Sequence, residues 1–246
     1  MLIDCAAYID GVRQTPMDIE AISDFLAAPQ PPGAFVWVAL FEPPPSLLSK
    51  MQEEFNLHEL AIEDTNRGSQ RPKLEEYGST LFVVLHTVER HGDDFVDGEL
   101  HIYCGEHFVL TVRHRAETGF RNVRAELERE PAFLALGPGA ALHGLLDTVV
   151  DRLFPEADAL EDRLDALETT IFDARTDRRA AAESLYALKR DTMCVRRAVT
   201  PLVEVCGRLL NHKHPIFRDA LRPYFRDVLD HVTRIDESLE IGRAHV

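Results

Sequence analysis

The 246-residue sequence has few cysteines and no long uncharged apolar run. Its four cysteines form no C-x-x-C pair and no metal-ligand spacing, which excludes a disulfide framework and fits thiols in a reducing compartment. The most apolar window, residues 139–150, is interrupted by His143 and Asp147, so we expect no segment of this chain to span a bilayer. Met1 is followed at once by Leu-Ile-Asp and not by a basic segment with an apolar core, so we expect the N-terminal part to be cytoplasmic.

The common motifs of nucleotide-binding and hydrolytic enzymes are also missing. The sequence contains no Walker-type loop, no G-x-G-x-x-G, no H-E-x-x-H and no G-x-S-x-G. No pairing of a nucleophile with a base can be read from it either, so we predict that the protein is not an enzyme.

Basic residues are scarce in comparison with acidic ones. The chain has 27 lysines and arginines against 42 aspartates and glutamates, a formal net charge of −15. Binding to nucleic acid depends on neutralising phosphates with lysine and arginine, so nucleic acid is excluded as a partner. Divalent cations are the more natural counter-charge.

The first 140 residues mix strand and helix patterns. Phe35–Phe41 is a nearly continuous β-branched and aromatic run, which predicts a strand covered on both faces in the centre of a sheet. Asp10-Gly11 predicts a hairpin turn. We predict an α+β fold whose residues 1–140 form an α/β/α sandwich with a mixed sheet. The other predicted strands are 2–8, 80–88, 99–104 and 107–113, and the predicted helices are 18–28, 43–55, 57–66 and 117–130.

From Ala141 the pattern becomes purely helical. Apolar residues at steps of three and four predict a helix of about nine turns, followed by a polar turn at Asp173–Asp177. A second helix repeats in three-four alternation and ends at Asn211–Pro215. Residues 141–214 are therefore predicted to form a long antiparallel helical hairpin.

A third helix is predicted to start at Pro223 and to continue to the end of segment 215–240. Pro223 suits a first helical position, and no glycine or proline stops the helix before Ile241, so we expect a truncated element. Residues 241–246 depart from the apolar seam and resemble translated adapter sequence; they are either an artefactual tail or a genuine frayed end. The predicted seam consists of Phe217, Leu221, Tyr224, Val228, Val232, Ile235 and Leu239.

Carboxylates are the remaining candidates for chemistry. Asp147 lies in an otherwise apolar stretch, where an acid must be paired, capped or metal-bound. Glu63 and Asp64 are adjacent on a short helix, a pattern typical of a solvated surface, and Asp227 near a helix start can complement the helix dipole. His212-Lys-His214 at a helix end is interpreted as favourable charge placement and not as a ligand pair.

The order of these parts resembles the CorA family of divalent-cation channels, over nearly all of residues 1–240. The segments that carry the resemblance are Leu57–Asp64, Gln70–Tyr77, Leu81–Leu85, Leu145–Asp151 and Pro223–His231. The resemblance implies a homopentamer in the inner or plasma membrane, with this segment as its cytoplasmic part and the third helix as the start of a stalk that leads to the pore.

The resemblance also implies a set of metal ligands. Asp64 of one subunit and Asp227 of its neighbour would form the main regulatory Mg²⁺ site, and Glu63 and Asp147 would form a second one. Co²⁺ is a possible alternative ion, and the related ZntB branch implies Zn²⁺. Both transmembrane helices and the Gly-Met-Asn filter motif of the family are missing, so contact with the membrane would come from a missing C-terminal segment. A soluble helical adaptor protein, with these acids as solvated surface, is the alternative from another class.

Overall fold

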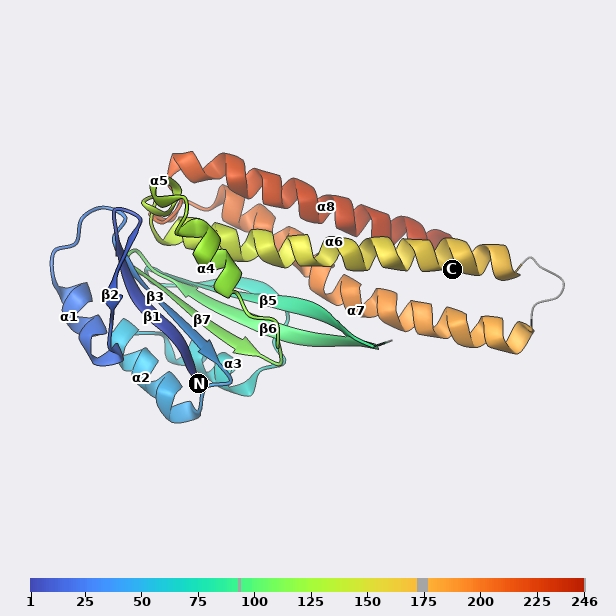
Figure 1. Cartoon of the computed structure of the whole chain (residues 1–246), viewed down its shortest axis with the longest axis horizontal. Coiled ribbons are helices and arrows are strands. Elements are labelled where there is room, and N and C mark those ends of the chain that lie inside the picture. Colours follow the sequence, from blue (N-terminus) through green and yellow to red (C-terminus); the bar gives the residue numbers. More distant parts are fainter. Residues whose placement is uncertain (93, 172–176, 246) are drawn as a thin grey trace.

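The computed structural model describes residues 1–92, 94–171 and 177–245. A seven-stranded sheet lies between short helices on one face and a layer dominated by three long helices on the other (Figure 1). The strand order is β2-β1-β3-β7-β6-β5-β4, with β3 and β7 parallel and all other neighbours antiparallel. This confirms the predicted mixed sheet. The strands are β1 (Leu2–Ile9), β2 (Val12–Pro16), β3 (Phe35–Phe41), β4 (Lys73–Tyr77), β5 (Thr80–His91), β6 (Asp94–Cys104) and β7 (Phe108–His114).

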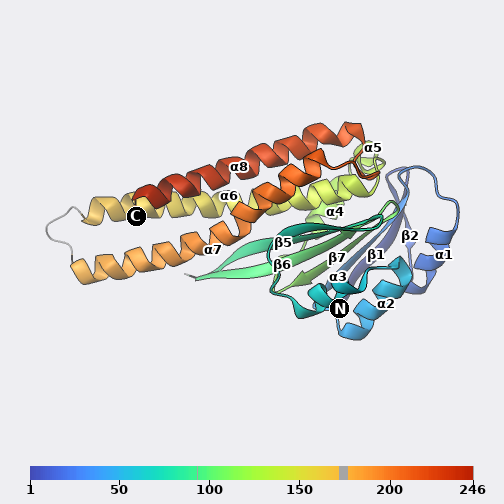
Figure 2. The ribbon, with the colours of Figure 1, turned by 180° about the vertical axis from the view of Figure 1, so that it is seen from behind.

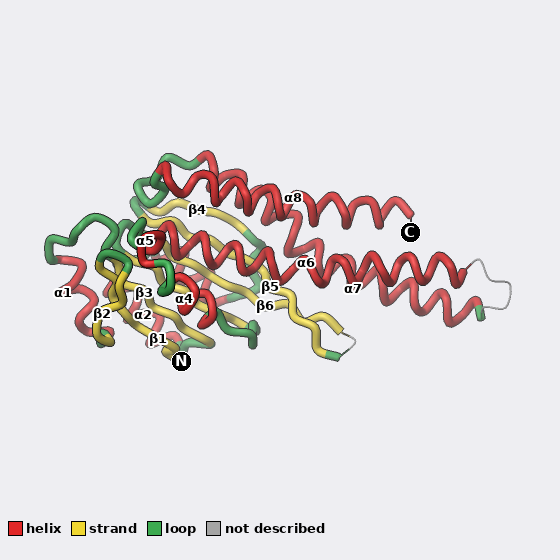
Figure 3. Tube along the Cα trace, turned by 45° about the horizontal axis from the view of Figure 1, so that its top comes forward, coloured by secondary structure: helices red, strands yellow, loops and turns green. Residues whose placement is uncertain are grey.

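Helices cover both faces of the sheet (Figure 3), and one hydrophobic core lies on each face, as an α/β/α sandwich requires. Strand β3 lies in the interior, with Phe35 and Trp37 in one core and Val36 and Val38 in the other. This explains its continuous apolar run. The first face carries η1 (Ile19–Ala21), α1 (Ile22–Ala27), α2 (Pro45–Phe55) and α3 (Glu59–Arg67). The opposite face carries α4 (Arg121–Leu127), α5 (Pro131–Leu134), α6 (Pro138–Ile171), α7 (Arg178–Asn211), η2 (Asp219–Leu221) and α8 (Arg222–His245).

Two details of the first 140 residues differ from prediction. The edge strand β4 was not predicted, because Lys73, Glu75 and Glu76 leave only Leu74 buried and so produce no apolar pattern. The single helix expected over 117–130 is instead α4 followed by α5, because Pro131 starts a new short helix. The predicted turn at Asp10-Gly11 is confirmed, since both residues have positive φ, at 51° and 73°.

Helices α6, α7 and α8 pack on one another along a common seam (Figure 2). Helices α6 and α7 are each 34 residues long and antiparallel, which confirms the hairpin, although α6 begins at Pro138 and not at Ala141. Buried Asp191 of α7 accepts a hydrogen bond of 2.7 Å from Arg163 of α6. Of the predicted polar turn, 173–176 lie outside the described residues, and Asp177 caps α7 by accepting the N–H of Arg179.

Helix α8 follows the predicted seam with one correction. Tyr224 is 46% exposed, and Phe225, at 2%, takes the core position four residues after buried Leu221. Tyr224 packs its ring against Phe133 and His143 instead. The backbone stays helical through His245, beyond the predicted limit at residue 240.

The histidines after α7 have tertiary partners, so the prediction of a favourable dipole charge is wrong for His214. Its Nε2 lies 3.0 Å from the carbonyl oxygen of Ser79, and burial lowers its pKa, which favours the neutral ring. His212 lies 3.3 Å from a carboxylate oxygen of Glu76. Both therefore tie the end of α7 to the β4–β5 edge of the sheet.

Within the part of the chain that the structure describes, no helix combines the length and the apolar character needed to cross a membrane.

Candidate metal centre

Three potential metal ligands converge where α6 packs on α8. Asp147 and Asp151 are one turn apart on α6, and His231 faces them from α8. One ligand atom from each of these residues lies within 4.8 Å of the other two. Asp227, one turn before His231, has a carboxylate oxygen 3.8 Å from Nδ1 of His231. We call these four residues the α6–α8 cluster.

The cluster carries three carboxylates that no basic side chain neutralises. Among the described residues, no lysine or arginine forms an ion pair with Asp147, Asp151 or Asp227. Burial raises the pKa of Asp147; His231 opposes this rise and Asp227 adds to it. Burial and the neighbouring Asp147 likewise raise the pKa of Asp151. Burial and mutual repulsion therefore disfavour the charged form of these two carboxylates.

The imidazole of His231 is placed to offer a nitrogen to the same point. Its Nδ1 is buried and has no hydrogen-bond partner among the described residues. The ring packs edge-on against Phe154, at a centroid distance of 5.6 Å, which fixes its orientation. A buried nitrogen without a hydrogen-bond partner, 3.8 Å from a carboxylate oxygen of Asp227, is the kind of polar atom that a cation satisfies.

The acids Glu63 and Asp64 lie on α3 and are already paired. Asp64 accepts a 2.6 Å hydrogen bond from Nζ of Lys73 on β4, and Glu63 pairs with Arg67 one turn later at 2.5 Å. Lys73 is shared with Glu75 at 2.8 Å. Glu63 and Asp64 therefore each already have a basic partner within the chain.

A buried polar network fixes α3 on the sheet. Thr65, the neighbour of Asp64, places its hydroxyl 2.6 Å from the Tyr103 hydroxyl and 3.0 Å from Nδ1 of His101. The Tyr103 hydroxyl donates to the carbonyl oxygen of Ala61 at 2.7 Å. All the side chains of this network that come from α3 and β6 are buried, so α3 has little freedom to rotate or slide.

Glu99 anchors the other end of the same network. Its fully buried carboxylate accepts hydrogen bonds from the N–H of Ser69 at 2.7 Å, from His101 at 2.9 Å and from Arg115 at 2.5 Å. Burial alone would raise the pKa of Glu99, but the hydrogen bonds from His101 and from backbone N–H groups lower it to about 2. Glu99 therefore clamps the loop that follows α3.

The structure brings together only part of the predicted ligand set. Asp147 and Asp227 meet in the α6–α8 cluster, whereas Glu63 and Asp64 lie on α3, across the sheet (Figure 1). Asp151 and His231 belong to the cluster and were not among the predicted ligands. A signal for them was present, because each lies four residues after a predicted ligand and therefore on the same helix face.

The donor set fits a divalent cation. Carboxylate oxygens are the ligands that Mg²⁺ prefers, and one or two of them with retained waters are enough. Imidazole adds a nitrogen donor, which suits Co²⁺ and Zn²⁺ better than Mg²⁺. The cluster therefore has the ligand types to bind a cation.

The sequence is similar to those of known metal transport proteins. The chain is 30% identical over 216 residues to YfjQ of Bacillus subtilis (strain 168), covering 87% of this chain and 66% of that protein. It is 26% identical over 200 residues to the cobalt/magnesium transport protein CorA of Thermotoga maritima, covering 80% of this chain and 56% of that protein. The chain thus spans less than two thirds of the length of these relatives.

The fold is shared with a solved CorA domain. The soluble domain of CorA from Methanocaldococcus jannaschii superposes with a TM-score of 0.74 at 17% identity, covering 100% of this chain and 94% of that one. At this identity the likeness shows the fold alone. The sequence model of the family described as CorA-like Mg²⁺ transporter protein matches residues 32–246. The chain therefore belongs to the CorA-like Mg²⁺ transporter family.

Proposed function

We propose that this chain is the cytoplasmic metal-sensing part of a CorA-type channel for Mg²⁺ or Co²⁺. The observation that carries the proposal is the α6–α8 cluster, in which Asp147, Asp151 and Asp227 have no basic partner among the described residues and His231 presents a buried nitrogen to them. Family membership supports divalent cations as the ligands. The adaptor alternative has no specific observation in its favour.

The metal sites are proposed to form between subunits of a homopentamer. Asp64 on α3 and Asp227 on α8 lie on opposite faces of the sheet, so one chain cannot bring them to one ion (Figure 1). A neighbouring subunit that places its α3 against this α8 would complete the pair. Glu63 of that neighbour would in the same way approach Asp147 in the α6–α8 cluster.

Metal binding and subunit association are coupled through electrostatic repulsion between the acidic chains. Each chain has a net charge of −15, so acidic subunits repel one another, and the repulsion is strongest where carboxylates face each other. A bound Mg²⁺ would neutralise these carboxylates and hold the interface together. Because metal binds the symmetric ring better than any splayed arrangement, loss of Mg²⁺ would shift the population toward forms in which the pore of the intact membrane protein can open.

A zinc- or cobalt-selective variant of the same function is the second candidate, and His231 is the observation that favours it. An all-carboxylate site discriminates little against Mg²⁺, whereas an imidazole ligand strengthens binding of Co²⁺ and Zn²⁺. In this alternative the chain would serve a transporter of the ZntB type.

Limited proteolysis tests the sensing function directly. Millimolar Mg²⁺ is expected to slow trypsin cleavage of the chain, and Asp227→Ala should abolish the protection. Asp230→Ala is the matched control, because Asp230 is an exposed acid on the same helix outside the cluster. If Asp227→Ala were protected as well as the parent, the ligand assignment would be wrong.

A further inference from the structure

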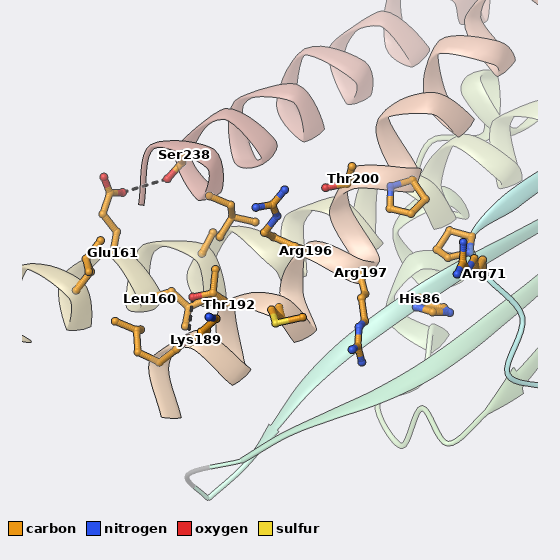
Figure 4. A pocket seen from close by; sticks show the side chains of 17 residues that line it. Arg71, His86, Leu160, Glu161, Lys189, Thr192, Arg196, Arg197, Thr200 and Ser238 are labelled. Carbon is orange, nitrogen blue, oxygen red and sulfur yellow. Dashed lines mark hydrogen bonds between the residues drawn. The ribbon is translucent and has the colours of Figure 1, made fainter. Parts of the chain in front are cut away.

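A large cleft lies among the long helices at a distance from the metal ligands. It has a volume of about 880 Å³ and is bounded by α6, α7, the end of α8 and the segment before β4 (Figure 4). This is within the size range of small-molecule sites. None of the four residues of the α6–α8 cluster lines it, so the metal site does not account for it.

The walls of the cleft are aliphatic. Leu160 and Leu164 of α6, Leu188 and Met193 of α7, and Leu239 of α8 line it, and among the described residues the only aromatic ring in the lining is that of His86. A base or another flat ring would therefore find little aromatic surface to stack on. A flexible aliphatic chain is the better complement, because its burial requires only apolar contact.

The charged residues of the cleft are mainly cationic. Arg71, Lys189, Arg196 and Arg197 line it against one carboxylate, that of Glu161, which accepts a hydrogen bond from Ser238 at 3.3 Å. This excess of positive charge occurs in a chain whose net charge is −15. An anion is thus the only class of charged ligand that the cleft favours.

Three of these cations are available to a ligand. Arg196 pairs with Glu240, but Arg71, Lys189 and Arg197 are exposed and form no ion pair with the described residues. In Figure 4, Arg71 and Arg197 lie toward His86, whereas Leu160 and Thr192 lie toward the other end of the cleft. Two guanidinium groups therefore lie together at the His86 end, whereas Lys189 and Glu161 lie near Leu160 at the other end.

We propose that this cleft binds an amphiphilic anion, with an unbranched aliphatic chain against the leucines and a phosphate or carboxylate head at Arg71 and Arg197. Arginine presents a planar fork of donors that suits both head groups. The occupant is a free, monomeric amphiphile that inserts its whole chain, not the surface of a bilayer. The proposal is independent of metal sensing, since the two sites share no residue.

Isothermal titration of the 246-residue chain with dodecyl phosphate below its micelle concentration tests the proposal. We expect saturable binding of one molecule per chain, at least about tenfold tighter than binding of inorganic phosphate, which lacks the chain, or of dodecyl maltoside, which lacks the charge. Equal affinity for either comparator would overturn the proposal, as would binding of phosphatidylglycerol vesicles without binding of monomeric dodecyl phosphate.

Matched variants locate the site. Arg71→Ala combined with Arg197→Ala should weaken dodecyl phosphate binding about tenfold, and Met193→Asp should weaken it by placing a carboxylate against the aliphatic wall. Arg208→Ala removes an exposed arginine of α7 outside the cleft and should change nothing. All three substituted positions of the cleft are exposed, so the variants are expected to fold, which circular dichroism verifies. Unchanged affinity in both cleft variants would place the ligand elsewhere.

Discussion

The two acidic regions of this chain differ in how their charge is balanced. On α3, Asp64 has Lys73 at 2.6 Å and Glu63 has Arg67 at 2.5 Å. In the α6–α8 cluster, Asp147, Asp151 and Asp227 have only the imidazole of His231, and burial raises the pKa of both Asp147 and Asp151. Both predicted ligands on α3 therefore have a basic partner, whereas none of the described lysines and arginines pairs with the carboxylates of the cluster.

This difference indicates which region needs metal most. A cation at α3 must compete with Lys73 for the Asp64 carboxylate, whereas a cation at the α6–α8 cluster relieves repulsion and satisfies a buried nitrogen. We therefore expect the cluster to bind metal first and α3 to contribute only when a neighbouring subunit presents it. Substitution of Asp64 would then affect metal binding only in the assembled state, whereas substitution of Asp147 would affect metal binding by the single chain as well.

The largest expected effect concerns the buried polar network that fixes α3 on the sheet. Glu99→Gln should lower the free energy of unfolding by about 3 kcal/mol, because it removes the buried anion that His101, Arg115 and the N–H of Ser69 contact. Urea unfolding followed by circular dichroism measures the loss, and Glu117→Gln, at an exposed position, is the control.

The same variant has a pH signature. The pKa of Glu99 is about 2 in the folded chain, below its ordinary value of 4.5, so its stabilising contribution is fully present above pH 4.5 and is lost as the pH falls toward 2. The difference in stability between parent and Glu99→Gln should shrink over that window. A difference independent of pH would contradict the assignment of a charged Glu99.

The next largest effect concerns the cluster itself. Asp147→Asn combined with Asp151→Asn should weaken binding of Co²⁺ about 100-fold, because two of the three carboxylates of the cluster are lost. Without metal, the same variant should be more stable than the parent at neutral pH, since raised pKa values mean that the charged carboxylates oppose folding there. Calorimetric titration and thermal unfolding measure the two effects. If the variant were less stable than the parent without metal, the claim that the charged carboxylates of the cluster oppose folding would be wrong.

A smaller effect is expected for His231, whose loss should change the affinity for Co²⁺ more than the affinity for Mg²⁺. His231→Gln should reduce Co²⁺ affinity about tenfold and change Mg²⁺ affinity less than about twofold, because nitrogen donors matter far more to Co²⁺. His212→Gln is the control, since His212 contacts Glu76 and lies outside the cluster. Equal losses for both ions would show that His231 supports the fold and does not bind metal.

The smallest effect concerns α3. Lys73→Met removes the cation that competes for Asp64 and should strengthen Mg²⁺ binding in the assembled state about fivefold, equivalent to a half-buried ion pair of about 1 kcal/mol. Lys50→Met, which breaks a surface pair with Glu20, should leave Mg²⁺ binding unchanged. Weaker binding in Lys73→Met would mean that Lys73 orients Asp64 and does not compete for it.

The fold was largely predictable because its signals are periodic. Apolar residues at steps of three and four predicted the long helices, and the continuous apolar run predicted β3 as an interior strand. Strand β4 was missed because an edge strand needs backbone partners but only one buried side chain, Leu74. Tyr224 was placed in the core because an aromatic residue at the right spacing cannot be distinguished from its neighbour Phe225 before the helix phase is known.

The candidate site was less predictable for a physical reason. Asp147 was identifiable as an acid in an apolar stretch, but its partners Asp151 and His231 look like ordinary surface residues until α6 and α8 are packed. The buried Glu99–His101 network also has no sequence signature, because its partners are backbone N–H groups and side chains up to 38 residues away. The pairing of Asp64 with Lys73 depends on the same unpredicted strand β4.

The central claim, that metal bridges acids of neighbouring chains, is tested most directly by sedimentation velocity of the 246-residue chain with and without millimolar Mg²⁺. The account predicts that Mg²⁺ shifts the parent to a species of several chains and that Asp227→Ala remains a monomer under the same conditions. An unchanged distribution for the parent, or equal association of parent and Asp227→Ala, would contradict it.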